Sequence, residues 1–515
     1  MIRSFLTVST GTLASRLLGF ARDAMVAALL GASPVADAFL VAFQLVNVVR
    51  RLLTEGALNN ALVPAWLAVR ETRGTDAAAA FAGRVLGTIS AALIGVTVIA
   101  GVLMPWIIVA LAPGFAGKEM LHLAVNDARL MLPYLAFAGP AAVTIALLNA
   151  QGRFALTAFA PLLFNGALIA AMIVLMLQRW DAAETALAIA ATVGIAGFLQ
   201  LLILIGRSRG THFATPLRIG FDAEMRGFLV KAIPGMVAGA GPQLLIVASA
   251  IVASASPSAV SWLYFANRLI ELPLGIVGVA VGAVLVPELA RSVHTADSAA
   301  AARAQSRGLE LAIGLALPAT LGLMVLSTSI VQLLFQHGAF TAADSDGTSA
   351  SLRWLALALP AQVLVKALSP AFFARGDTAT PLWSTLKGLA VTIALAVVLG
   401  RLFDVRGIAA AIALGGWSSA LDLARRGLAT FGLAIDAVAH RRLWRIVAAA
   451  LAMGGLLWLA APPVLALSGN HAGPLHFFLV AALIVAGMTV YGLFLALFGV
   501  LRWADAIRNL RQSRA

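Results

Sequence analysis

The chain has 515 residues, of which 61% are hydrophobic and 11% are charged. Because an ordinary soluble protein carries roughly 25% charged residues, this composition excludes a soluble enzyme and predicts a membrane protein. The formal net charge of +14 would favour a nucleic-acid partner in a soluble protein, but here we assign much of it to basic loops, and no nucleic-acid partner is expected.

Apolar runs of about 18–25 residues recur along the whole chain, and each could cross a hydrocarbon core of about 30 Å as a helix. Strands of a membrane barrel would be only about 9–11 residues long and would alternate. We therefore predict an all-α polytopic membrane protein with about 14 transmembrane helices. In chain order the segments are 5–30, 36–60, 82–111, 124–149, 156–178, 185–206, 228–253, 259–287, 308–336, 349–373, 381–401, 407–430, 443–466 and 475–500.

The first segment lacks a convincing cleavable signal, because Arg16, Arg22 and Asp23 interrupt it, so we expect a retained helix. Arginine is concentrated in every second break between segments and at the C-terminus, as at Arg153 and Arg291. Since short cytoplasmic loops carry an excess of Lys and Arg, both termini are predicted to face the cytoplasm.

Short motifs recur in the two halves of the chain at a nearly constant offset. The matches are Pro64 with Pro287, Phe115 with Phe340, Pro133 with Pro360 and Gly152 with Gly376, at offsets of 223, 225, 227 and 224. The offset covers six predicted helices, so both copies enter the membrane from the same side. Such parallel repeats are typical of transporters that rock two lobes around a central site. We predict an N-lobe over 1–220, a C-lobe over 221–435, and two further helices with a basic tail over 436–515.

Charged residues inside the predicted segments are informative, because each costs about 2.5–3.5 kcal/mol near mid-membrane on insertion scales. The candidates in the first, second and eighth segments are Arg16, Arg22, Asp23, Asp37, Arg50, Arg51, Glu55, Ser261, Arg268 and Glu271. Neighbouring opposite charges could form structural ion pairs that hold helices together, and arginines near helix ends can reach the headgroups. Both interpretations remain open for each single residue.

Taken together, the arginines outnumber the acids beside them, which are Asp23, Glu55 and Glu271. A surplus of arginine in a membrane cavity predicts an anionic cargo, and the planar guanidinium matches phosphate oxygens in pairs. The hypothesis is a substrate pocket between the lobes, with the acids in supporting or gating roles. Its basic lining is Arg16, Arg22, Arg50, Arg51 and Arg268.

Other residue types give weaker signals. None of the seven histidines forms a metal-ligand pair with supporting acids, and there is no cysteine, so neither a metal, a cofactor nor a catalytic group is predicted. The seventh and eleventh segments contain no carboxylate, so they give no sign of a cation-coupling site. Lys366 and Lys387 are further candidates, although Lys387 can equally extend to the headgroups.

Several motifs resemble the lipid II flippases of bacteria, the MurJ or MviN group. They include Ser15–Asp23, Asp37–Phe39, Arg50–Ala57, Ala112–Phe115 and Ser261–Pro273, and the resemblance covers essentially the whole chain. It implies the fold of the multidrug/oligosaccharidyl-lipid/polysaccharide exporter superfamily in the bacterial inner membrane. Asn267 departs from the pattern, since the family often has Asp there.

The resemblance also implies a function and roles for residues. The substrate would be lipid II, a polyprenyl diphosphate bearing a disaccharide-peptide, moved from the inner to the outer leaflet for peptidoglycan synthesis. Membrane lipids and cell-wall synthesis proteins are the other expected partners. Essential cavity roles carry over to Arg16, Arg22, Arg50 and Arg268, supporting cavity roles to Asp37 and Ser261, and a lipid-tail groove to the last two helices. Ser261 is also counted among the expected substrate-binding residues.

Alternatives stay open beside this function. A related exporter could carry another lipid-linked glycan or a drug, although drug export predicts an aromatic or acidic cavity. A membrane enzyme acting on polyprenyl diphosphates would need clustered acids or histidines near the membrane surface. A scaffold within a cell-wall complex would not require charge inside the membrane. No P-loop is present, so the membrane potential is the expected driving force.

Overall fold

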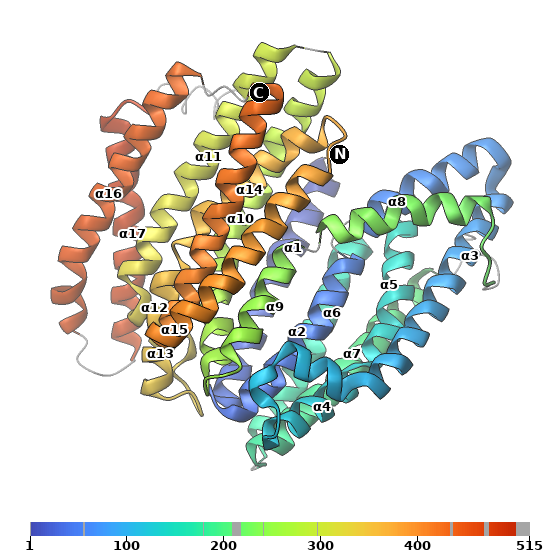
Figure 1. Cartoon of the computed structure of the whole chain (residues 1–515), viewed down its shortest axis with the longest axis horizontal. Helices are drawn as coiled ribbons and strands as arrows, with labels where there is room; N and C mark the ends of the chain where they lie inside the picture. Colours follow the sequence, from blue (N-terminus) through green and yellow to red (C-terminus); the bar gives the residue numbers. More distant parts are fainter. Residues whose placement is uncertain are drawn as a thin grey trace. The chain divides into compact units, whose positions relative to one another are not determined.

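The computed structural model describes residues 2–500 except 55–56, 179, 209–217, 240, 296, 433–435 and 468–472. Every regular element in this part of the chain is a helix (Figure 1). Each predicted apolar segment coincides with helical residues. The all-α fold class is therefore confirmed.

The first of two compact units comprises Met1–Ser261 and His337–Phe340. Its helices are α1 (Ile2–Leu30), α2 (Pro34–Thr54), α3 (Ala57–Leu111), the 3-10 helix η1 (Pro113–Phe115), α4 (Glu119–Met131), α5 (Pro133–Ala150), α6 (Phe154–Met176), α7 (Ala182–Ser208), α8 (Ala223–Gly239) and α9 (Gly241–Ala253). Within the unit, α1 packs on α6, α2 on α4, and α3 on both α5 and α8. The lobes predicted from the repeat remain a prediction, because these units follow compactness rather than repeat symmetry.

Helix α8 is attached to α3 by charged and close backbone contacts. Arg84 of α3 lies 2.9 Å from Asp222 and 2.8 Å from Glu224, at the start of α8. Gly87 of α3 leaves room for the incoming chain, because a Cβ there would lie 2.6 Å from the carbonyl oxygen of Arg218. These contacts fix the beginning of the predicted second half of the chain against α3.

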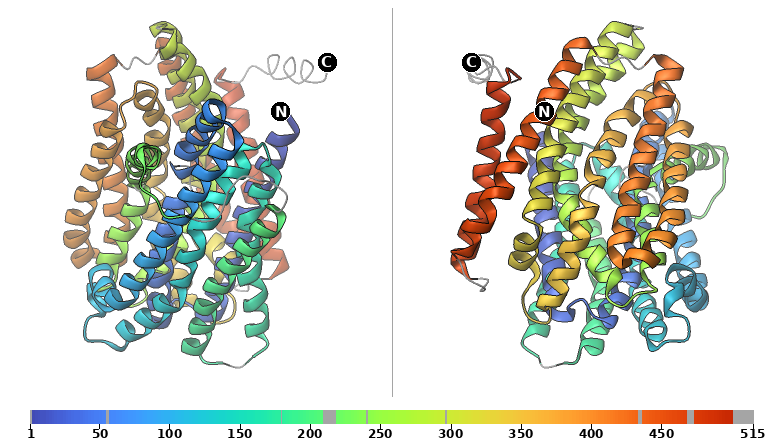
Figure 2. Two further views of the ribbon diagram at one scale, coloured as in Figure 1. Left: turned by 90° about the vertical axis from the view of Figure 1, so that its right-hand side faces the viewer. Right: turned by 60° about the vertical axis from the view of Figure 1, so that its left-hand side comes forward.

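The second unit comprises Trp262–Gln336 and Thr341–Ala515. Its helices are α10 (Ala259–His294, which begins in the first unit), α11 (Ser298–Val325), α12 (Ser327–Phe335), α13 (Ala342–Leu355), α14 (Ala358–Phe373), α15 (Ala379–Phe431), α16 (Ala437–Ala466) and α17 (Pro474–Leu497). Here α14 packs on α15, and α16 packs on α11 and α17 (Figure 2). Leu326, Met453, Leu457 and Leu483 form the apolar core around the last two helices.

Two elements are longer than one membrane crossing. Helix α15 has 53 residues, which as a straight helix would be about 80 Å long. It turns back at Phe403 and Asp404, where Asp404 has a φ of 50°. The break falls between the predicted segments 381–401 and 407–430, as the sequence indicates. Helix α3 likewise contains a non-helical residue, Gly74, with a φ of 86°.

Eight helices within the described ranges are long and apolar enough to cross a membrane, or nine if α13 and α14, bent by 44°, count as one span. The other predicted segments lie in shorter, divided or more polar helices, and two share α15. Notably, α1, α2 and α10 are not among the eight or nine. These helices carry the charged residues expected at the site, and charged helices of this kind face protein or water rather than lipid.

Candidate functional site

Asp37, in the first turn of α2, bonds to the N-terminus of α10. Its carboxylate accepts hydrogen bonds from the backbone N–H groups of Ser258 at 2.7 Å and Ser261 at 2.8 Å, and from the Ser261 hydroxyl at 2.5 Å. The first N–H groups of a helix have no partner within the helix, and its positive end attracts a carboxylate. Both side chains are buried. Asp37 therefore caps a helix that begins more than 200 residues later in the chain.

Two loops related by the repeat make equivalent contacts in the same unit. The backbone N–H of Ala339 donates to the carbonyl of Ala28 at 2.8 Å, and that of Gly114 donates to the Ser254 hydroxyl at 3.0 Å. Each loop thus touches the C-terminal end of the first predicted segment of the other lobe, which is the end of α1 or of α9. The contact is too close for a side chain at Gly338, since a Cβ there would lie 2.3 Å from the Ala28 oxygen.

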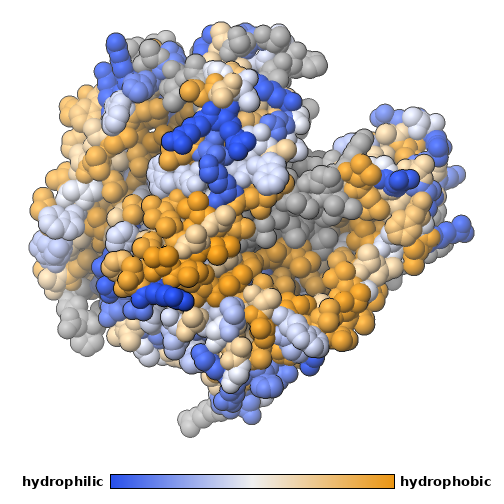
Figure 3. All heavy atoms as spheres, in the orientation of Figure 1, coloured by the Kyte–Doolittle hydropathy of each residue, from blue (hydrophilic) through white to orange (hydrophobic). Residues whose placement is uncertain are grey.

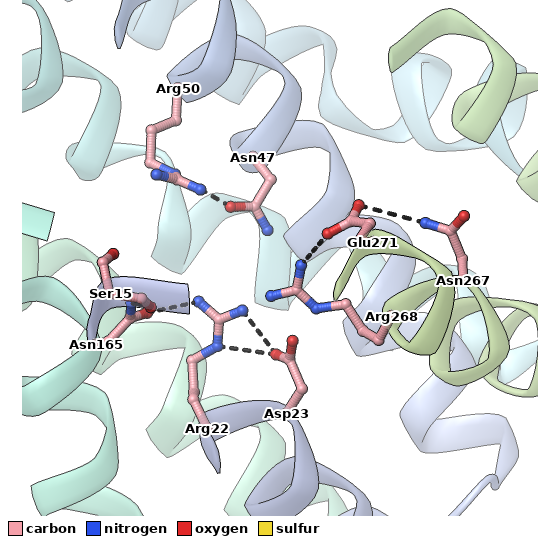
Figure 4. A network of polar contacts seen from close by, with 9 residues as sticks. All are labelled: Ser15, Arg22, Asp23, Asn47, Arg50, Asn165, Asn267, Arg268 and Glu271. Atoms are coloured by element: carbon pink, nitrogen blue, oxygen red, sulfur yellow. Dashed lines mark hydrogen bonds and ion pairs between the residues drawn. The ribbon is translucent and has the colours of Figure 1, made fainter. Parts of the chain in front are cut away.

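Arg22 of α1 is buried and hydrogen-bonded through three nitrogens (Figure 4). Its Nε and Nη2 donate to one carboxylate oxygen of Asp23 at 2.9 and 2.6 Å, and its Nη1 donates to the Asn165 amide oxygen at 3.0 Å. The guanidinium carbon also lies 4.8 Å from the centre of the Phe43 ring. Asn165 in turn donates to the carbonyl of Ser15. The Arg22–Asp23 ion pair considered from the sequence is present, within a network that also fixes α1 against α6.

Arg50 of α2 lies against Phe164 of α6, the residue next to Asn165. Its Nε donates to Asn47 at 3.2 Å, and its guanidinium lies 5.8 Å from the centre of the Phe164 ring. Arg22 and Arg50 therefore converge from two helices on Phe164 and Asn165. Aromatic faces and amide oxygens attract a guanidinium without cancelling its charge.

The remaining predicted residues of the first unit are less defined. Arg16 is exposed on α1. The side chain of Arg51 and the whole of Glu55 lie outside the described residues, so their expected roles are untested by the structure.

In the second unit, Arg268 and Glu271 of α10 form the predicted ion pair. Both side chains are partly buried, at 18% and 21% exposure. Asn267 donates its amide to the second oxygen of Glu271 at 3.3 Å. A residue that departs from the family pattern thus donates to the acid that pairs with Arg268. Further along α10, Lys366 of α14 reaches over Gly278, with Nζ 3.5 Å from the position a Cβ would take.

Among the residues that the structure describes, no group of three or more His, Asp or Glu side chains could hold a metal ion. The polar groups that converge in the first unit are guanidinium and amide groups, which suit binding of an oxyanion. Asn165 was missed from the sequence, because a single neutral amide in an apolar segment carries no charge signal. Asn47, by contrast, lies three residues before Arg50 on α2, so helix geometry places the two side chains next to each other.

Comparison with known proteins agrees with this fold and chemistry. A family model described as lipid II flippase MurJ matches residues 26–469. A probable lipid II flippase MurJ of Rhizobium tropici is 35% identical, over 100% of this chain and 97% of that protein. One of Rhizobium meliloti is 37% identical, over 97% and 94%. The lipid II flippase MurJ of Burkholderia cenocepacia is 33% identical, over 89% and 90%.

Solved structures support the fold. A lipid II flippase MurJ in an inward closed conformation matches with a TM-score of 0.79 and 22% identity, over 98% of this chain and 100% of that one. An inward-facing multidrug resistance transporter of the MATE family, within the MOP superfamily, matches with a TM-score of 0.65 and 15% identity, over 86% and 98%. At these identities the structural matches establish the architecture alone.

Proposed function

The chain belongs to the MurJ family of lipid II flippases, and we propose that it moves a polyprenyl-diphosphate-linked peptidoglycan precursor from the inner to the outer leaflet by alternating access. The protein is a multi-pass membrane protein of a family of the bacterial inner membrane. We orient it with both termini in the cytoplasm, on the asymmetry of basic residues in its loops.

The observation that carries the proposal is the convergence of Arg22 and Arg50 on α6. Guanidinium groups in an apolar bundle are costly unless they are paired, and they often mark a substrate pathway. Arg22 donates to the Asp23 carboxylate and the Asn165 amide oxygen and lies near the Phe43 ring, and Arg50 donates to Asn47 and lies near the Phe164 ring. The oxygens of a diphosphate can accept hydrogen bonds from both guanidinium groups, in competition with these partners.

Arg16, Arg51 and Arg268 complete the proposed set of diphosphate ligands. Asp23, Glu55 and Glu271 are counter-ions in this scheme, which hold arginines in place when no substrate is bound. Glu271 accepts from both Arg268 and Asn267, so it can keep one hydrogen bond when the diphosphate competes for the arginine. The polyprenyl tail stays in the lipid, as the amphipathic chemistry of such a substrate requires.

Asp37 and Ser261 act in closing the protein rather than in direct contact with the cargo. The Ser261 hydroxyl is fully buried and bonded to Asp37, which supports this role. The loops at Gly114 and Gly338 add two backbone contacts of the same kind. An opening of the protein at the cap of α10 would break this cap and both loop contacts together.

The driving force in this proposal is the membrane potential. An inside-negative potential favours outward transfer of negative charge by about 2.3 kcal/mol per charge per 100 mV. A diphosphate that moves outward with part of its charge uncompensated is therefore exported without ATP. Flipping in sealed vesicles should increase when an inside-negative potential is imposed, and flipping that is indifferent to it would reject the coupling.

The decisive experiment is depletion of the protein, followed by measurement of lipid II in each leaflet with a reagent that reaches only the outer one. We expect lipid II to accumulate in the inner leaflet. Arg16→Ala or Arg268→Ala should fail to restore growth although the folded protein is present, whereas the exposed Arg425→Ala should restore it. An unchanged leaflet distribution on depletion, or full rescue by Arg16→Ala, would contradict the proposal.

A further inference from the structure

We propose that Lys387 and Arg426, one on each limb of α15, form a binding site for the headgroup phosphate of an anionic phospholipid. The site lies in the second compact unit and uses none of the residues assigned to lipid II. Lys387 was a candidate from the sequence that the flippase function leaves unexplained.

Close packing of the two limbs brings the site together. The limbs run antiparallel, and their contact needs two glycines. A Cβ at Gly388 would lie 1.8 Å from the Ser419 hydroxyl, and one at Gly415 would lie 1.8 Å from the Thr392 hydroxyl. Lys387 and Ser384 therefore lie next to Asp422, which is 35 and 38 positions later in the chain. These residues lie near the end of the hairpin at which α15 begins and ends.

Asp422 is the base of the site. Its carboxylate accepts hydrogen bonds from Lys387 Nζ at 2.7 Å, Arg426 Nε at 2.8 Å and the Ser384 hydroxyl at 2.8 Å. The Asp422 side chain is only 10% exposed, whereas Lys387 and Arg426 are 54% and 48% exposed. A buried acid thus holds two cations side by side at the surface.

The two cations keep unused donors. Lys387 donates through one of its three N–H groups, and Arg426 only through Nε, in the contacts formed within the described part of the chain. The two amino nitrogens of Arg426 remain for a ligand. Asp422 offsets one of the two positive charges, and Asp377 also interacts electrostatically with Arg426. The remaining N–H donors of the two cations suit the oxygens of a phosphodiester.

The surroundings point to a lipid rather than a soluble anion. Trp383 lies one turn before Lys387 on the same face and is 62% exposed, and Leu421 and Leu428 are exposed on other faces of the limb that carries Arg426. Tryptophan favours the headgroup level of a membrane. On the face drawn in Figure 3, a hydrophilic patch lies above a broad hydrophobic band in the region where Figure 1 shows α15.

The leaflet follows from the orientation that we proposed above, and the binding itself does not depend on it. The cluster lies at the end of α15 that adjoins Arg375 and the break after the tenth predicted segment, on the side assigned to the cytoplasm. Basic pockets between membrane helices on that side bind anionic headgroups. Simple extension of Lys387 to the headgroups would not require a buried acid to fix it.

The test compares lipid binding by the purified full chain in neutral detergent. Phosphatidylglycerol and phosphatidylcholine with the same acyl chains are added, and the retained lipid is counted by native mass spectrometry. The variant Lys387→Gln/Asp422→Asn/Arg426→Gln removes the site while leaving no uncompensated buried charge. The control variant Arg401→Gln/Arg406→Gln removes two exposed arginines beside the turn of the same hairpin.

We expect the unaltered protein and the control to retain phosphatidylglycerol over phosphatidylcholine, and the triple variant to bind phosphatidylglycerol about tenfold more weakly. Equal retention by the triple variant overturns the proposal. Inorganic phosphate that displaces the lipid at millimolar concentration would instead indicate a site for free anions and also overturns it. A salt titration of the unaltered protein gives a readout that does not depend on the variants, because only phosphatidylglycerol retention should fall as ionic strength rises.

Discussion

Asp37 and Ser261 occupy equivalent positions of the internal repeat, 224 residues apart, and are hydrogen-bonded to each other at 2.5 Å. Residues related by a two-fold pseudo-axis can contact each other only where the axis passes between them. The repeat-related loops at Gly114 and Gly338 make equivalent contacts with α9 and α1. We propose the cap of α10 as the central element of closure, and this role leads to the first two predictions.

Asp37→Asn should weaken closure without changing the size of the side chain. The amide loses the charge that stabilises the positive end of α10, which is worth about 1–2 kcal/mol at a helix N-terminus. We expect slower lipid II flipping in proteoliposomes and a lower thermal unfolding midpoint. Asp346→Asn, at an exposed acid near the start of α13, is the control and should leave both measurements unchanged. A fully active Asp37→Asn would show that the cap is dispensable.

Gly338→Ala should force the loop away from α1. Its φ of 59° disfavours a side chain, and the new Cβ would lie 2.3 Å from the backbone oxygen of Ala28. Gly152→Ala is a matched control, because Gly152 has a φ of 76° but nothing within 4 Å of a Cβ. Since the chain lacks cysteine, a single Ala36→Cys, buried on α2, can report opening.

The reporter should react with an impermeant maleimide several-fold faster in Gly338→Ala than in Gly152→Ala. Flipping should fall only in the former. Equal labelling rates in the two variants would mean that this contact does not hold the protein closed.

Arg22→Lys should abolish most flipping although the positive charge is kept. A lysine ammonium is a point charge, and it lacks the planar fork that lets Arg22 bond Asp23 and Asn165 in two directions. We expect flipping to fall at least about tenfold in the variant, a loss that corresponds to one strong charge-assisted interaction. Unfolding temperatures measured beside the flipping rates separate loss of binding from loss of fold. Activity near the original level would show that the charge alone is enough.

Exchange of the pair on α10 separates stability from function. Arg268→Glu alone places two acids side by side and should destabilise the protein. The double variant Arg268→Glu/Glu271→Arg restores opposite charges at the same spacing, so the unfolding midpoint should recover while flipping stays low. Recovery of flipping in the double variant would indicate that Arg268 has only a structural role.

The sequence predicted most of the local structure. Long apolar runs specify helices directly, and the polar break around Asp404 predicted the turn within α15. In the structure Asp404 has a positive φ, which interrupts the helix at that point. The pairs Arg22–Asp23 and Arg268–Glu271 could be anticipated, since their partners are one and three residues apart.

Contacts between distant residues were harder to predict. Asn165 lies 143 residues from Arg22, and Asp422 lies 35 residues from Lys387. No periodicity links such residues, because their approach depends on how helices pack. The Asp37–Ser261 contact is an exception, since its separation equals the repeat offset, and that signal was available before the structure. The start of α8 against Arg84 had no comparable signal.

The cap of α10 also bears on how leaky the idle protein is. A transporter preserves the ion gradients of its membrane only if it is never open to both sides at once. In the closure that we propose, the buried carboxylate of Asp37 and its three hydrogen-bond donors oppose spontaneous separation of this junction. We therefore expect the idle protein to conduct few ions while precursor is scarce.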